Sequence, residues 1–168
     1  DAGFIIAGYS DGGGAGSDDF YLIKTNANGE REWSKMYGTS GWDQAQSIHQ
    51  LSDGGYIVAG RGGFGLLRLN GAGDIIWTKT MNIPGSDYIQ SVEETDDGGF
   101  IVSGYTDGMG AGGKDVFLIK LDASGIISWF NLYGNSLDEY SYKAMQCYDG
   151  GYVITGNSYS NSAGYGDI

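Results

Sequence analysis

Short runs of apolar and aromatic residues, each bounded by Gly, Asn, Asp or Ser, recur along the whole chain. In the first part of the chain these runs are 4–9, 20–25, 31–37 and 43–51. Runs of this length, rich in β-branched and aromatic residues and closed by turn residues, are typical of β-strands. None carries the sustained 3.6-residue apolar spacing of a helix. The pattern therefore predicts an all-β chain, built from units of four short strands joined by hairpins.

The four-strand unit is itself repeated. Nearly the same phrase, DAGFIIAG, DGGYIVAG, DGGFIVSG and DGGYVITG, begins at Asp1, Asp53, Asp97 and Asp149, and its aromatic residues are spaced by 52, 44 and 52 residues. A four-stranded unit that recurs every 40–50 residues is typical of β-propeller blades. We expect a β-propeller with antiparallel blades of about 44–52 residues, in repeats 1–52, 53–96, 97–148 and, incomplete, 149–168.

Glycine and tryptophan recur at fixed distances within the unit. A turn glycine comes four residues before each of three tryptophans, and each of these tryptophans comes 23 residues before the aromatic residue of the next copy: Trp33, Trp77 and Trp129. Because Gly tolerates the positive φ of tight hairpins, these turns are expected to fix the strand register. Segments 10–19, 106–115 and 158–167 vary in sequence, and the second copy is eight residues shorter there. We expect exposed loops at these segments.

The order of these features resembles known propeller repeats. A strand that ends in Gly, a variable loop, an aromatic strand and a Trp strand resemble a Kelch blade, with AG, SG or TG where Kelch has two glycines. The stretches TNANGEREW, LNGAGDIIW and LDASGIISW are similar to the Trp-docking motif of quinoprotein propellers, one residue shorter. The chain as a whole resembles the DGGYIVAG-type repeats of large bacterial and archaeal secreted or surface proteins. This resemblance implies an extracellular or cell-surface location.

A Kelch-like layout would make 43–51, 87–95 and 139–147 the innermost strands of their blades. The 168 residues then hold two complete blades, one blade without its inner strand and the start of a fourth. Since propellers usually close with 4–8 blades, the chain is expected to be a segment of a longer propeller, or to complete its ring with other copies.

Composition narrows the function classes. The net charge of −12, from 21 acidic and 9 basic residues, argues against a nucleic-acid partner, which needs a basic surface. The sequence has one histidine, His49, on which no catalytic triad can be built. It has one cysteine, Cys147, which cannot form an internal disulfide. No apolar run approaches the 18 residues of a membrane span, so we expect no membrane insertion by this segment. Neither a catalytic group nor a bound cofactor is predicted.

Carboxylates in the first loop form the candidate metal site. Asp11, Asp18 and Asp19 are candidate Ca²⁺ ligands, since Ca²⁺ takes six to eight oxygens, although the EF-hand pattern is absent. Asp19 recurs as Asp115 and Asp167, which favours a structural role such as capping turn N–H groups. The Gly-rich loops lack the Lys-Ser/Thr ending and the following helix of a phosphate-binding loop.

A second group of candidates lies where the expected inner strands begin. Asp43, Asp87 and Glu139 recur ten residues before the Asp of each DGG phrase, and such positions face the mouth of a propeller channel. An acidic ring there would attract a cation or a basic peptide, whereas the alternative is a repeated strand-start contact. Beside them, Trp42 and Tyr88 could stack on a sugar or a partner's side chain, or pack between blades.

These features predict a non-catalytic propeller module that serves as a structural or protein-interaction unit of a larger extracellular or cell-surface protein. Its partners would be other proteins or neighbouring copies of the same protein. The first alternative is a carbohydrate-binding propeller, and the second is a quinoprotein-like or hydrolytic enzyme. An enzyme should break the repeat at its site, and the irregularities here are few: the short second loop, Trp42 and His49.

Overall fold

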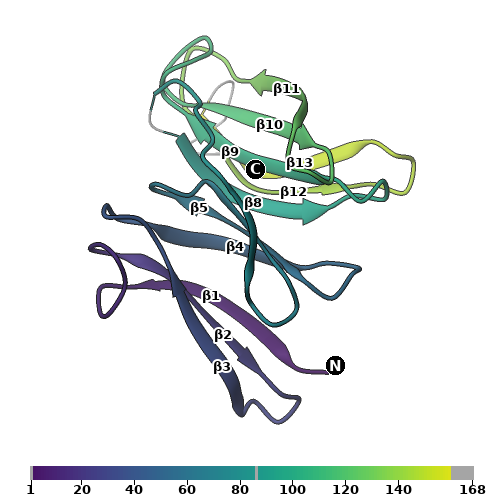
Figure 1. Ribbon diagram of the computed structural model, residues 1–168. Helices are drawn as coiled ribbons and strands as arrows, with labels where there is room; N and C mark the ends of the chain where they lie inside the picture. Colours follow the sequence, from purple (N-terminus) through teal and green to yellow (C-terminus); the bar gives the residue numbers. More distant parts are fainter. Residues whose placement is uncertain (1, 86, 160–168) are drawn as a thin grey trace. The chain divides into compact units, whose positions relative to one another are not determined.

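A computed structural model of the protein describes residues 2–85 and 87–159 and shows an all-β chain (Figure 1). Across these residues thirteen strands form four antiparallel sheets, none of which is closed into a barrel. The described residues contain no helix long and apolar enough to cross a membrane. The chain divides into two compact units, Asp1–Met81 and Asn82–Ile168, which we call unit 1 and unit 2.

Unit 1 contains two sheets in which neighbours in the chain are neighbours in the sheet. The first has the order β1-β2-β3 and the second the order β4-β5-β6-β7. The strands of unit 1 are β1 (Phe4–Ser10), β2 (Asp19–Thr25), β3 (Arg31–Tyr37), β4 (Gln44–Gln50), β5 (Tyr56–Arg61), β6 (Leu66–Leu69) and β7 (Ile75–Lys79).

Unit 2 repeats this plan. One sheet has four strands in the order β11-β10-β9-β8, and the other consists of β12 paired with β13. The strands of unit 2 are β8 (Asp87–Glu94), β9 (Phe100–Thr106), β10 (Asp115–Leu121), β11 (Ile127–Tyr133), β12 (Glu139–Gln146) and β13 (Tyr152–Ser158).

The strands predicted from the apolar runs are confirmed, as are the turns between them. The runs expected at 4–9, 20–25, 31–37 and 43–51 correspond to β1, β2, β3 and β4. Gly29, Gly73 and Gly125 each have φ near +80°, as a tight hairpin requires. The middle residue of the DGG phrase takes the same conformation, with φ of +82° at Gly54 and +75° at Gly98. We call β4, β8 and β12, which run into these turns, the lead strands, and β1, β5, β9 and β13 the second strands.

Within unit 1 the two sheets bury one apolar core. Phe20 and Leu22 of β2 pack with Tyr56 and Val58 of β5, and all four side chains are at most 2% exposed. Trp33 on β3 meets Tyr56 edge-to-face, with ring centroids 6.1 Å apart and an interplanar angle of 70°. Such contacts add to the area-based stabilisation of burial. The fixed spacing of 23 residues thus places a tryptophan of one sheet against the aromatic residue of the next.

Unit 2 uses the same contact between its own two sheets. Ile101 and Leu118 pack with Ala144, and Trp129 on β11 meets Tyr152 on β13 edge-to-face at 5.4 Å. The repeated spacing in sequence therefore corresponds to a repeated contact in space.

A buried cation recurs in β2, β6 and β10, at the position where the pairing of each of these strands with the next strand shifts. Lys24, Arg68 and Lys120 are between 4% and 7% exposed, and each donates to the carbonyl of the residue that follows it. Arg68 and Lys120 also form ion pairs with the Asp of the DGG turn, Asp53 and Asp97 respectively. Buried charges need such partners, so Arg68 and Lys120 each tie a turn to a strand end.

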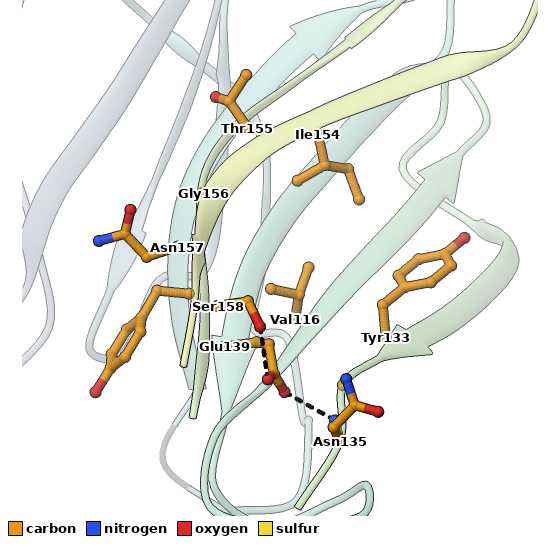
Figure 2. A pocket seen from close by; sticks show the side chains of 11 residues that line it. Val116, Tyr133, Asn135, Glu139, Ile154, Thr155, Gly156, Asn157 and Ser158 are labelled. Carbon is orange, nitrogen blue, oxygen red and sulfur yellow. Dashed lines mark hydrogen bonds between the residues drawn. The ribbon is translucent and has the colours of Figure 1, made fainter. Parts of the chain in front are cut away.

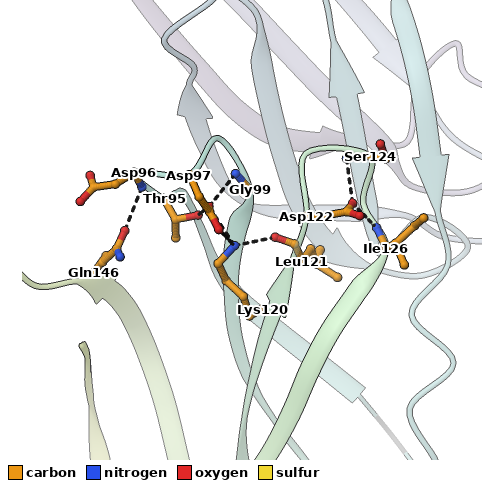
Figure 3. A network of polar contacts seen from close by, with 10 residues as sticks. All are labelled: Thr95, Asp96, Asp97, Gly99, Lys120, Leu121, Asp122, Ser124, Ile126 and Gln146. Carbon is orange, nitrogen blue, oxygen red and sulfur yellow. Dashed lines mark hydrogen bonds and ion pairs between the residues drawn. The ribbon is translucent and has the colours of Figure 1, made fainter. Parts of the chain in front are cut away.

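The Asp97 turn shows this tie in full (Figure 3). The carboxylate accepts from the hydroxyl of Thr95 at 2.6 Å, from the ammonium of Lys120 at 3.0 Å and from the amide of Gly99 at 3.0 Å. These donors, led by the Thr95 hydroxyl, hold the pKa of Asp97 well below its ordinary value near 4.

The depressed pKa makes a pH-dependent prediction. A carboxylate with a lowered folded-state pKa stabilises the fold above its unfolded pKa and loses that contribution as the pH falls. Asp97→Asn should therefore be less stable than the parent at pH 7 and should lose less stability between about pH 5 and pH 2. Because the Asp97 side chain is two-thirds exposed, solvent screening keeps the effect small. Urea unfolding at pH 7, pH 5 and pH 2 measures the difference in stability, with Asp96→Asn as the control. Equal acid sensitivity of the Asp97→Asn and Asp96→Asn variants would contradict the prediction.

Candidate functional site at the start of the lead strands

The two acidic residues whose side chains are described at the lead-strand starts are both engaged in hydrogen bonds. Asp43 is 0% exposed and accepts from the amide of Thr39 at 2.7 Å, from the Thr39 hydroxyl at 2.9 Å and from the amide of Phe64 at 2.9 Å. It thereby joins the β3–β4 connection to the loop between β5 and β6. These are the contacts expected of a structural strand-start residue.

Glu139 makes the corresponding contacts in unit 2. It is 7% exposed, and its carboxylate accepts from the amide of Asn135 at 2.8 Å and from the hydroxyl of Ser158 at 3.0 Å (Figure 2). Asp87 begins β8, and its side chain lies outside the described part of the chain.

Trp42 belongs to an exposed cluster in unit 1. Its ring is 51% exposed, and the guanidinium of Arg61 lies 5.4 Å from the ring centroid. Arg61 donates to the amide oxygen of Gln44 through two nitrogens, and the Gln44 amide donates to Asp18 at 2.6 Å. We call these four residues the Trp42 cluster. An aromatic face, a guanidinium, an amide and a carboxylate are thus presented together at the start of β4 and the end of β5.

Unit 2 has an array of tyrosines at the matching strand ends. Tyr88 on β8 stacks on Tyr105 on β9, with centroids 4.8 Å apart. Tyr105 meets Tyr140 on β12 edge-to-face at 4.9 Å, and Tyr140 meets Tyr159 at 6.1 Å. Tyr88 thus packs between two strands of one sheet, and the contact of Tyr105 with Tyr140 joins the two sheets of unit 2.

One lysine lies over two rings of this tyrosine array. The ammonium of Lys114 lies 4.9 Å from the ring centroid of Tyr140 and 5.8 Å from that of Tyr105, and donates to the Tyr140 hydroxyl at 3.1 Å. The Tyr140 hydroxyl raises the pKa of Lys114, with a smaller contribution from the charge of Asp138. The cation is therefore held over the rings, an arrangement stabilised by cation–π attraction.

The candidate calcium ligands do not form one cluster. Asp11 lies in the exposed loop, Asp18 joins the Trp42 cluster and Asp19 is 1% exposed. Among the described residues, no group of three or more His, Cys, Asp or Glu side chains is placed to hold a metal ion.

Asp19 and its counterpart Asp115 are instead enclosed by glycines. A Cβ on Gly14 or Gly38 would collide with the Asp19 carboxylate, and one on Gly110 or Gly134 with that of Asp115. One oxygen of each carboxylate has no hydrogen-bond partner among the described residues. The Gly-rich loops thus make room for a buried carboxylate. Asp167, the third member of this series, lies outside the described residues.

A cleft of about 400 Å³ opens beside Glu139, between β10 and β11 on one side and β13 on the other (Figure 2). Tyr133 lines it and is 48% exposed, whereas the equivalent Tyr37 of unit 1 is 8% exposed. The Tyr37 hydroxyl donates to the carbonyl of Gly73 in the β6–β7 turn at 2.6 Å, and burial raises its pKa to about 12. The cleft therefore marks a position that a hairpin fills in unit 1, and its shape needs no small ligand to explain it.

Neither the buried cations nor the tyrosine array was predicted from the sequence. The cations had a signal, because a basic residue interrupts the apolar strand at one position of three copies: Lys24, Arg68 and Lys120. The array had none, since Tyr105 and Tyr140 are brought together only by the packing of two sheets.

Comparisons with known proteins bear on the fold alone. No family model matches the chain, and no curated protein matches it. Nine chains of solved structures match, among them the crystal structure of a protein of unknown function from Bacteroides caccae. That structure is 13% identical, has a TM-score of 0.57 and covers 88% of this chain. The chain spans about half (49%) of the length of that protein.

Proposed function

We propose that residues 1–168 are a segment of a β-propeller that serves as a non-catalytic structural or protein-interaction module. On the resemblance to DGGYIVAG-type repeats, this module belongs to a larger extracellular or cell-surface protein. Its partners are other proteins or neighbouring copies. The longer length of the matching solved structure is in keeping with a segment of a larger protein.

One observation carries the proposal: within each unit, the same aromatic contact joins one sheet to the next. Trp33 on Tyr56 and Trp129 on Tyr152 both link the last strand of one sheet to the second strand of the next. Four-stranded meanders that stack face to face through a repeated contact are the building blocks of propellers. A structural role also accounts for the repeated charges, since Asp43, Glu139 and Lys120 all hold turns or strand ends.

The experiment measures whether the two units form one rigid body, as a propeller requires. Spin labels at Asn28→Cys and Ser124→Cys, in a Cys147→Ser background, would sit on the exposed β2–β3 and β10–β11 turns. Pulsed electron–electron double resonance should give a single narrow distribution of the distance between the two labels. A broad distribution would contradict the propeller. Each label paired with a second label in its own unit provides the reference width.

A second candidate function, carbohydrate binding, is favoured by the Trp42 cluster. A half-exposed indole can stack on a sugar ring, and the Arg61, Gln44 and Asp18 side chains provide hydrogen-bonding groups next to it.

Under this second candidate, Trp42→Ala should weaken retention on polysaccharide about tenfold or more, because the stacking face is removed. Affinity electrophoresis in gels containing soluble glucans, xylan or mannan measures the retention. Ile75→Ala, which removes another half-exposed apolar side chain of unit 1, is the matched control. Unchanged migration of the parent protein in every gel would count against a glycan ligand.

A further inference from the structure

The second strands share a glycine at their fifth position. These glycines are Gly8, Gly60, Gly104 and Gly156 of β1, β5, β9 and β13. None has a positive φ, so the backbone conformation does not demand glycine there. Glycine is unfavourable inside a strand, and it usually marks a close approach of another backbone.

In three of the four strands that close approach is visible. A Cβ on Gly60 would collide with the carbonyl oxygen of Gln44, and one on Gly104 with that of Tyr88. A Cβ on Gly156 would collide with the carbonyl oxygen of Tyr140. In each case the carbonyl belongs to the paired lead strand.

The cause is a bulge at the same place in each lead strand. The pairing shifts between Ala45 and Ser47 in β4, between Ile89 and Ser91 in β8, and between Ser141 and Lys143 in β12. The residue that lies opposite the glycine comes directly before the extra residue of the bulge. Because a bulge bends its strand, the lead strand approaches the second strand closely, and only glycine fits opposite.

Gly8 is the exception. A Cβ placed on it would meet no atom within 4 Å. In the described part of the chain β1 pairs with β2 alone, so no lead strand lies along its other edge. Gly8 thus has the residue type that a lead strand requires, in a strand where no lead strand is present.

The segment before β1 leads to the same conclusion, because Gly3 lies as the last glycine of a DGG turn does. A Cβ on Gly3 would collide with the carbonyl of Thr25, as one on Gly99 would with that of Leu121.

We propose that the free edge of β1 is the docking site of one further strand of the β4, β8 and β12 type, carried by the same polypeptide and joined to β1 through the turn at Gly3. The inference rests on the repeat architecture of the proposed function and deepens it by naming the segment that binds. The recognition is by backbone hydrogen bonds along the edge, with Gly8 admitting the bulge.

The three existing pairs define the register of this strand. Its bulge lies opposite the Gly8–Ala7 step, as the bulges of β4, β8 and β12 lie opposite the matching steps of β5, β9 and β13. The residue before the bulge faces Gly8, and the residue before that one faces Tyr9 and directs its carbonyl at Gly8.

The experiment places residues 43–52 of this chain, DQAQSIHQLS, directly before Asp1, which recreates the order lead strand, turn, second strand. The extended chain should show at least tenfold greater hydrogen-exchange protection of those β1 amides that do not bond to β2. Its thermal midpoint should rise by roughly 4 °C or more. A chain extended with the same ten residues in shuffled order should show neither change.

Substitution of Gly8 tests whether this glycine admits the bulge of the docked strand. Gly8→Ala should leave the unextended chain as stable as the parent, because its Cβ meets open space, and should abolish both gains in the extended chain. Gly156→Ala, whose Cβ would collide with Tyr140 and Ser141 of the lead strand β12, should destabilise either chain and shows the size of the effect. Equal gains in the extended chain with and without the Gly8→Ala substitution would overturn the proposal, as would the absence of any gain.

Three further outcomes separate this inference from docking between copies and from the proposed function. A gain accompanied by dimerisation in light scattering would show docking between copies and overturn docking within one polypeptide. A narrow distance distribution between the two units with no gain in β1 protection would remove the docking site alone. A broad distribution would remove the propeller, whatever β1 shows.

Discussion

Replacing Asp43 with Ala should lower the free energy of unfolding of unit 1 by about 3 kcal/mol. The carboxylate is fully buried and satisfies two backbone amides, those of Thr39 and Phe64, which come from different connections. Alanine would leave both part-buried amides without this partner, and a buried orphan donor costs about 1–3 kcal/mol. The loss should appear in urea unfolding followed by tryptophan fluorescence.

Two substitutions make the Asp43 result specific. Asp43→Glu should retain part of the stability, since Glu139 accepts an equivalent amide bond in unit 2. Asp11→Ala, on the exposed loop of the same unit, should change stability by no more than about 0.5 kcal/mol. A loss at Asp43 no larger than the one at Asp11 would mean that the buried bonds do not hold the connection.

Phe20→Ala should cost about 4 kcal/mol, because truncation of a fully buried aromatic side chain removes apolar contact and leaves a cavity. Phe20 is 0% exposed, lies against Gly60 of the neighbouring sheet and meets Phe64 edge-to-face at 6.4 Å. Urea unfolding of unit 1 measures the loss. Phe4→Ala, at a side chain that is 59% exposed, is the matched control and should be close to neutral. Similar losses at both positions would contradict the assigned core.

Most strands could be predicted because their signals are local. The run 20–25 contains aromatic and β-branched residues between turn residues, and β2 covers Asp19–Thr25. The turn glycines could be predicted equally well, since a positive φ at Gly29 or Gly73 is a property of a few neighbouring residues.

The environment of the acidic residues could not be predicted in the same way. Asp43 has the sequence of an exposed strand start, yet Phe64, which donates to it, lies 21 residues away and reaches it through the pairing of β4 with β5. The choice between a ligand-facing carboxylate and a structural one depends on such non-local partners. The same holds for Trp42, whose neighbour Arg61 comes from the far end of the hairpin.

The glycine of the second strands lies between these two cases. Its recurrence at Gly8, Gly60, Gly104 and Gly156 can be read from the sequence, and its cause cannot, because a bulge in the paired strand leaves no local pattern. Only the structure shows which of the four glycines lacks the strand that it accommodates.

The contact of Trp33 with Tyr56, and of Trp129 with Tyr152, has a consequence for how the protein unfolds. Within both units, one repeat completes its core with a residue of the next one, so the cooperative unit is larger than the repeat and offset from it. Nearest-neighbour coupling of this kind makes stability grow with the number of copies. A truncation inside a repeat therefore weakens the neighbour that survives, and folding is expected to spread from one copy to the next.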